Sequence, residues 1–110
     1  MKLYIFFIVI FAFGFSLVFA HQPQSIDITV SGKDVSIYVS HPVSNAEKHY
    51  IRKIEVSVNG REIIEQTFST QTDNSQEAVY HIPSLKKSDI LEVKAYCSRF
   101  GELRKRIIVH

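Results

Sequence analysis

Residues 25–40, SIDITVSGKDVSIYVS, decide the fold class of this chain. Apolar side chains occupy every second position on both sides of a turn that contains Gly32. A period of two is typical of a β-strand that buries one face and exposes the other to water. The stretch therefore predicts two strands, at 26–30 and 35–39, joined by a turn at 31–34.

The same alternation continues along the chain and predicts further strands at 54–58, 61–64, 78–82, 91–97 and 103–109. Asn59-Gly60 separates two of them, and Asn-Gly between apolar strands indicates a hairpin because both turn residues need a positive φ. About seven strands with evenly spaced turns predict an all-β fold, an immunoglobulin-like antiparallel β-sandwich, with a small barrel as the alternative. The expected core side chains are Val35, Ile37, Val39, Ile54, Val56, Val58, Leu91, Val93 and Ala95.

The first twenty residues have a different character. Lys2 gives a positive start, and residues 3–19 carry no charge. Val18 and Ala20 are small enough for the recognition positions of a signal peptidase. The run is short for a spanning helix, which needs roughly 20 apolar residues. We expect a signal peptide at 1–20, one domain at 21–110 and a periplasmic or secreted protein with no membrane contact after cleavage; an uncleaved anchor is the alternative.

Charge and cysteine content narrow the function classes. The formal net charge is +2, and loss of Lys2 with the signal peptide leaves the domain nearly neutral. A nearly neutral domain argues against nucleic acid as the main partner. Cys97 is the single cysteine, so no disulfide can form within the chain. Its thiol is left with three roles: apolar packing, an intermolecular link or metal ligation.

Three side chains form a candidate metal site. His41 continues the inward face of the strand at 35–39 by one step, and Cys97 does the same for the strand at 91–97. His49 follows His41 by eight residues, across a mostly polar loop. Two imidazoles and one thiolate suit a transition metal. The structural alternative is a core cysteine with two loop histidines.

Three segments carry a resemblance to a known family. His41-Pro42-Val43, His49-Tyr50-Ile51 and the run 96–101, YCSRFG, follow one another in the chain. In order and approximate spacing they resemble the iron-binding domain of desulfoferrodoxin and neelaredoxin, the superoxide reductases. The resemblance implies an immunoglobulin-like sandwich and a mononuclear non-haem iron held by four histidines and an axial cysteine.

Carried over by position, the resemblance places His41, His49 and Cys97 on ligand positions. It implies superoxide, or another small anion, as substrate and an unidentified electron donor as partner. Phe100 stands where the family motif has its last histidine, and the early ligand, in a Glu-Lys-His loop, has no clear match. We therefore expect a divergent superoxide reductase-like oxidoreductase with an incomplete ligand set, whose enzymatic activity depends on whether the iron site is intact.

Two alternatives come from other classes of protein. The first is a non-catalytic periplasmic binding module similar to the scaffold subunit of the thiosulfate-carrying complex, which would need no metal. The second is a copper-binding protein. Cleavage after Ala20 would make His21 the first residue, and its amine and imidazole together can chelate Cu(II).

Overall fold

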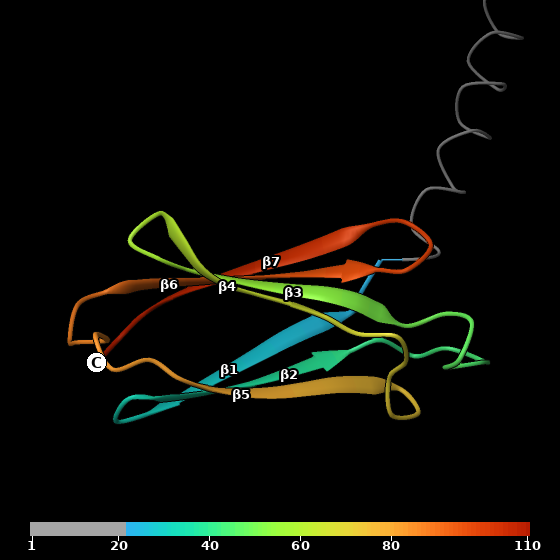
Figure 1. Ribbon diagram of the computed structural model, residues 1–110, viewed down its shortest axis with the longest axis horizontal. Coiled ribbons are helices and arrows are strands. Elements are labelled where there is room, and N and C mark those ends of the chain that lie inside the picture. The colour runs from blue at the N-terminus through green and yellow to red at the C-terminus, as the bar shows by residue number, and fades with distance from the viewer. Residues whose placement is uncertain (1–21) are drawn as a thin grey trace, which may run out of the picture.

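The computed structural model describes residues 22–110, which form an immunoglobulin-like sandwich of two antiparallel sheets (Figure 1). The first sheet has the order β1-β2-β5, and the second has the order β4-β3-β6-β7. The strands are β1 (Ser25–Ser31), β2 (Asp34–Ser40), β3 (Ile51–Val58), β4 (Arg61–Thr67), β5 (Ser75–His81), β6 (Ile90–Cys97) and β7 (Glu102–Ile108). Because the strands form two separate sheets, the fold is the expected sandwich and not the alternative small barrel. No helix in the described part of the chain is long and apolar enough to cross a membrane.

Two tight turns build the hairpins that the sequence predicted. Gly32 turns β1 into β2 with a φ of 61°. Asn59 and Gly60 turn β3 into β4 with φ values of 52° and 82°, the left-handed pair that this hairpin type requires. The side-chain amide of Asn59 also donates to the Asp89 carboxylate at 3.0 Å and accepts from the Ile90 backbone N–H at 2.9 Å. These hydrogen bonds fix the hairpin against the start of β6.

The core lies between the two sheets and consists of the inward side chains of the alternating strands. All of the expected core residues are buried except Val58, which is partly exposed at the end of β3. Ile26, Ile51, Ile82, Leu85 and Val109 complete the cluster. Each fully buried aliphatic side chain contributes about 1.5–3 kcal/mol relative to an exposed one, so the alternating pattern itself stabilises the sandwich.

The strand order brings three strand ends together at one end of the sandwich. β2 and β6 finish there and β3 begins there, at the right-hand end of Figure 1. Ile51 pairs with Cys97 in the β3–β6 ladder. Beyond that pair, the Ser98 amide donates to the Tyr50 carbonyl at 2.7 Å and the Tyr50 amide donates to the Ser98 hydroxyl at 3.1 Å. This end of the fold therefore holds the loop 41–50 and the end of β6 side by side.

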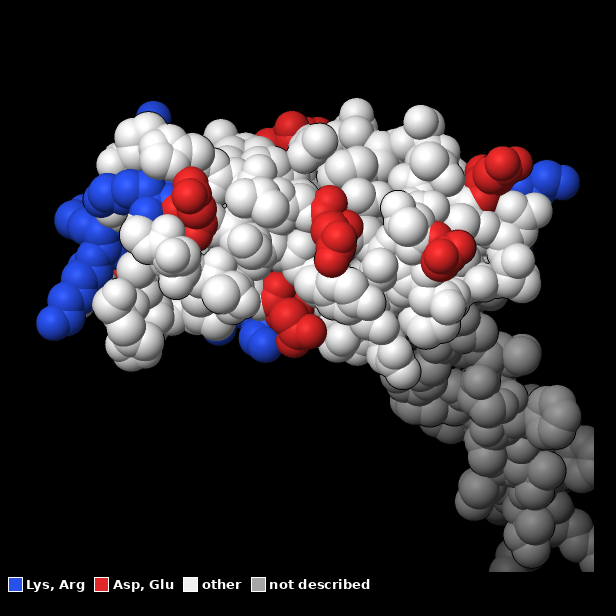
Figure 2. Space-filling model, turned by 90° about the horizontal axis from the view of Figure 1, so that it is seen from below, with Lys and Arg blue, Asp and Glu red and all other residues white. Residues whose placement is uncertain are grey.

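Charged side chains are distributed unevenly over the surface. Seen from the side of the three-stranded sheet, acidic residues are scattered and basic residues gather at the end that holds the β1–β2 turn (Figure 2). Lys33, Lys86 and Lys87 lie at this end and are exposed. This basic end is opposite to the end where β2 and β6 finish. The expected signal peptide at 1–20 lies outside the described residues.

A charge in the core should unfold the sandwich, whereas the same charge on its surface should not. Val93 is fully buried in β6, and Val79 in β5 is 68% exposed. Val93→Asp should lower the free energy of unfolding by about 3–5 kcal/mol, because the carboxylate would enter the core without a partner. Val79→Asp should lower it by less than about 1 kcal/mol. Urea unfolding measures both, and equal losses would contradict the sandwich.

Candidate metal centre

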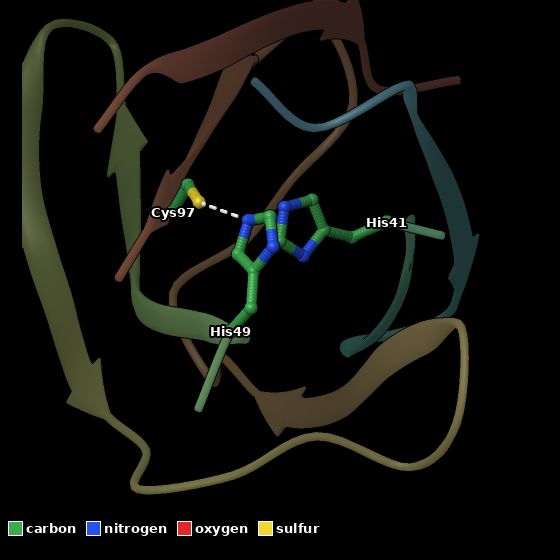
Figure 3. Close-up of side chains that lie close together, drawn as sticks. All are labelled: His41, His49 and Cys97. Atoms are coloured by element: carbon green, nitrogen blue, oxygen red, sulfur yellow. Dashed lines mark hydrogen bonds between the residues drawn. The ribbon is translucent and has the colours of Figure 1, made fainter. Parts of the chain in front are cut away.

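His41, His49 and Cys97 meet at the end of the sandwich (Figure 3). Each residue offers one donor atom, and the three donor atoms lie within 4.8 Å of one another. His41 directly follows β2, His49 lies two residues before β3, and Cys97 is the last residue of β6. The strand-end convergence expected from the sequence is therefore present in the fold.

His49 and Cys97 are in direct contact. The Nε2 atom of His49 lies 3.0 Å from the Sγ atom of Cys97. A turn at Asn45 sets this position, because its carbonyl accepts from the His49 amide at 2.9 Å and its side chain accepts from the Glu47 amide at 3.1 Å. The Tyr50–Ser98 hydrogen bonds then hold His49 opposite the thiol.

His41 is buried, with 2% of its surface exposed. Its ring meets the His49 ring edge to face, with centroids 4.7 Å apart and planes at 87°. Nδ1 lies 2.9 Å from the Oε1 atom of Gln71. Nε2 is buried and has no hydrogen-bond partner within residues 22–110. Buried polar atoms are nearly always paired in native proteins. This nitrogen is therefore available to bind a metal ion or another partner that the described residues do not supply.

The donor set fits a transition metal. Two atoms bound to one ion at about 2.0–2.3 Å each are at most about 4.6 Å apart. Separations of no more than 4.8 Å are therefore close to what joint ligation needs. Thiolate and imidazole are the donors that iron, copper and zinc accept in proteins, whereas hard cations prefer oxygen. The three residues can thus hold part of an iron coordination shell.

Gln71 belongs to this end of the fold, although no pattern in the sequence indicates it. It lies in the loop between β4 and β5 but is only 5% exposed. Its amide nitrogen donates to the carbonyls of His41 and Asp73, and its amide oxygen accepts from the backbone of Ile51. A glutamine in a polar stretch is usually solvated, so only the three-dimensional structure identifies this one.

The β6–β7 connection borders a surface pocket beside Cys97. A surface pocket of about 370 Å³ is lined by Cys97, Phe100 and Gly101, with Arg52 and Arg99 among its other walls. Phe100 is 53% exposed. The start of the described chain lies here too, because a Cβ atom on Gly101 would lie 3.0 Å from the Cα of Gln22. His21, named above for copper, is the residue before Gln22 and lies outside the described residues.

Charges near the site differ in their availability. Arg52 and Arg99 are exposed at the pocket, and Lys48 is exposed on the loop at 41–50. Arg104 instead faces Glu92, with 3.8 Å between Nε and Oε1. Arg52 and Arg99 therefore bring positive charge to the pocket, partly offset by Glu102 in its lining and by the contact of Arg52 with the Tyr96 ring at 5.2 Å.

A second group of potential ligands, Glu55, Glu62 and Glu65, lies around the β3–β4 hairpin. Lys53 approaches Glu55 at 4.0 Å and Glu65 at 3.8 Å. A hydrogen bond between Glu55 and Glu62 lowers the pKa of Glu55 and raises the pKa of Glu62. The three carboxylates thus have partners within the protein.

Comparisons with known proteins agree with this geometry. The desulfoferrodoxin family model matches residues 19–104. A superoxide reductase from Giardia intestinalis is 25% identical, with a TM-score of 0.62 over 81% of this chain and 97% of that chain. A hypothetical protein from Pyrococcus horikoshii OT3 is 22% identical, with a TM-score of 0.54 over 82% and 88%. No curated protein matches the chain.

A third solved structure, a superoxide reductase in the oxidized state, has 20% identity and a TM-score of 0.51 over 82% of this chain and 88% of that chain. At this level of identity the likeness concerns the fold. The family match covers most of the chain, from before β1 into β7. The family resemblance seen in the sequence is confirmed by that match. The chain belongs to the desulfoferrodoxin family.

Proposed function

We propose that this protein is an exported, superoxide reductase-like member of its family that binds one non-haem iron through His41, His49 and Cys97. The observation that carries the proposal is the convergence of these side chains, from three separate segments, with donor atoms within 4.8 Å. Chance placement of a buried thiol and two imidazoles at matching family positions is a poor alternative explanation.

Each residue has a separate task in the proposed site. Iron with a thiolate ligand would supply the electron that, with two protons, converts superoxide into hydrogen peroxide, and an external one-electron donor would restore it. Cys97 would supply the thiolate from a position that is 2% exposed. Arg52 and Arg99 would draw the anion towards this end, an effect that weakens as salt increases.

The small number of metal ligands limits the superoxide reduction that we expect. Phe100 places an apolar ring where the family motif has its last histidine. Fewer donors mean weaker retention of the metal, and the vacant position would be open to water or other ligands. We therefore expect weak iron binding and superoxide reduction well below that of a site with all five ligands.

His21 is the candidate for a further imidazole. The next residue in the sequence, Gln22, lies against Gly101, which lines the pocket beside Cys97. Removal of residues 1–20 during export would also free its amine, a second nitrogen donor. His21 is thus a further candidate donor on the ground of its position in the sequence alone.

The first prediction concerns the thiolate and the missing histidine. Anaerobic Fe(II) titration of the wild type followed by oxidation should give a thiolate-to-iron charge-transfer band. Cys97→Ser should abolish the band, and Phe100→His should raise iron affinity by about tenfold or more by adding an imidazole. Ile108→His adds a histidine at a similarly exposed position away from the site and should change neither the iron affinity nor the charge-transfer band. A band that survives in Cys97→Ser would refute the site.

The second prediction separates the iron centre from the copper and scaffold alternatives. In protein that begins at His21, His21→Ala should weaken Fe(II) binding, and His110→Ala at the other terminus should not. Copper binding that needs His21 but is indifferent to Cys97→Ser would favour the amino-terminal copper site. No metal bound by either protein, with the fold intact by circular dichroism, would favour the non-catalytic scaffold.

A further inference from the structure

We infer that Gln71 is a positioning residue for the metal centre: it fixes the tautomer of His41 and joins the two ends of the loop that carries His41 and His49. The inference rests on the proposed metal site for its purpose, but its geometry is independent of any metal. Gln71 comes from the loop between β4 and β5, an element that contributes none of the three donors.

The orientation of the Gln71 amide is determined by its backbone partners. Its nitrogen lies 2.7 Å from the carbonyl oxygen of His41 and 3.0 Å from that of Asp73, and both of these atoms can only accept. Its oxygen lies 2.9 Å from the Ile51 amide, which can only donate. The reversed amide would lose all three hydrogen bonds, so the oxygen must face Ile51 and His41.

This orientation decides which ring nitrogen of His41 carries the proton. The Gln71 oxygen lies 2.9 Å from Nδ1 of His41 and has no hydrogen to offer. Nδ1 must therefore donate, and in the neutral ring the lone pair is left on Nε2. Nε2 is the buried nitrogen without a hydrogen-bond partner in residues 22–110, and His41 is one of the three clustered donors. Gln71 thus prepares His41 to bind a metal before the metal arrives.

Gln71 also joins the backbone on both sides of the loop at 41–50. It accepts from Ile51, two residues after His49, and donates to the carbonyl of His41. Asn74 extends the clamp, because its carbonyl accepts from the His41 amide at 2.8 Å and its side chain accepts from the Val43 amide at 3.2 Å. One buried amide therefore sets the start and the end of the segment that carries both histidines.

The test compares Gln71→Met, which keeps the length but removes all side-chain hydrogen bonds, with Gln71→Glu, which keeps an acceptor oxygen towards Nδ1 of His41 and the Ile51 amide but loses the donors to the His41 and Asp73 carbonyls. The matched control is Gln76→Met in β5, whose side chain contacts only the neighbouring Glu77 carbonyl among the described hydrogen bonds. The ¹⁵N shifts of the His41 ring in metal-free protein report the tautomer. Co(II) titration reports metal affinity.

We expect the Nδ1–H tautomer in the wild type, in Gln76→Met and in Gln71→Glu. Gln71→Met should show a mixture of tautomers and a Co(II) dissociation constant raised about 10–100-fold, the usual effect of removing a partner of a ligating histidine. Gln71→Asn, with a shorter side chain, should behave like Gln71→Met and replaces it if that variant does not fold.

Two results would overturn the inference. One is an Nε2–H tautomer in the wild type. The other is a tautomer and a Co(II) affinity that change equally in Gln71→Glu and Gln71→Met, because Gln71 would then act only as a structural clamp. Failure of the proposed function can be told apart from failure of this inference. If the wild type binds no metal, the ¹⁵N shifts of the metal-free protein still show the tautomer of His41.

Discussion

The pairing of β3 with β6 is the interaction on which the rest of the structure depends. These strands lie at the centre of the four-stranded sheet, and their inward residues Ile54, Val56, Val93 and Ala95 are fully buried. The ladder ends with Ile51 opposite Cys97. Because the hydrophobic faces allow only one register, the same packing that stabilises the sandwich also fixes the thiol next to the segment that carries His49.

The candidate centre uses this rigid frame and adds the polar groups that strand ends make available. Side chains at the end of an inward face are shielded by the core on one side and open to loops on the other. His41 and Cys97 occupy such positions, which explains why both are 2% exposed although both are polar or reactive. A donor in this setting is dry enough to interact strongly with a metal and close enough to the surface for small anions to approach.

The sequence predicted the strands, both hairpins and nearly all of the core, because period-two burial depends on neighbours that are close in the chain. It also placed His41 and Cys97 on inward faces for the same reason. It could not predict Gln71, whose burial depends on partners 20 and 30 residues away. Nor could spacing alone bring His49 to Cys97, since that contact follows from the order of strands in the sheet. The division of the chain at residue 20 stays a prediction.

The central claim is that His41, His49 and Cys97 together bind one iron ion. X-ray absorption at the iron edge of the loaded protein tests it most directly, because it reports the atoms bonded to the metal without reference to activity. The account predicts one sulfur neighbour and at least two imidazole nitrogens in the first coordination shell. A shell of oxygen and nitrogen without sulfur would contradict it.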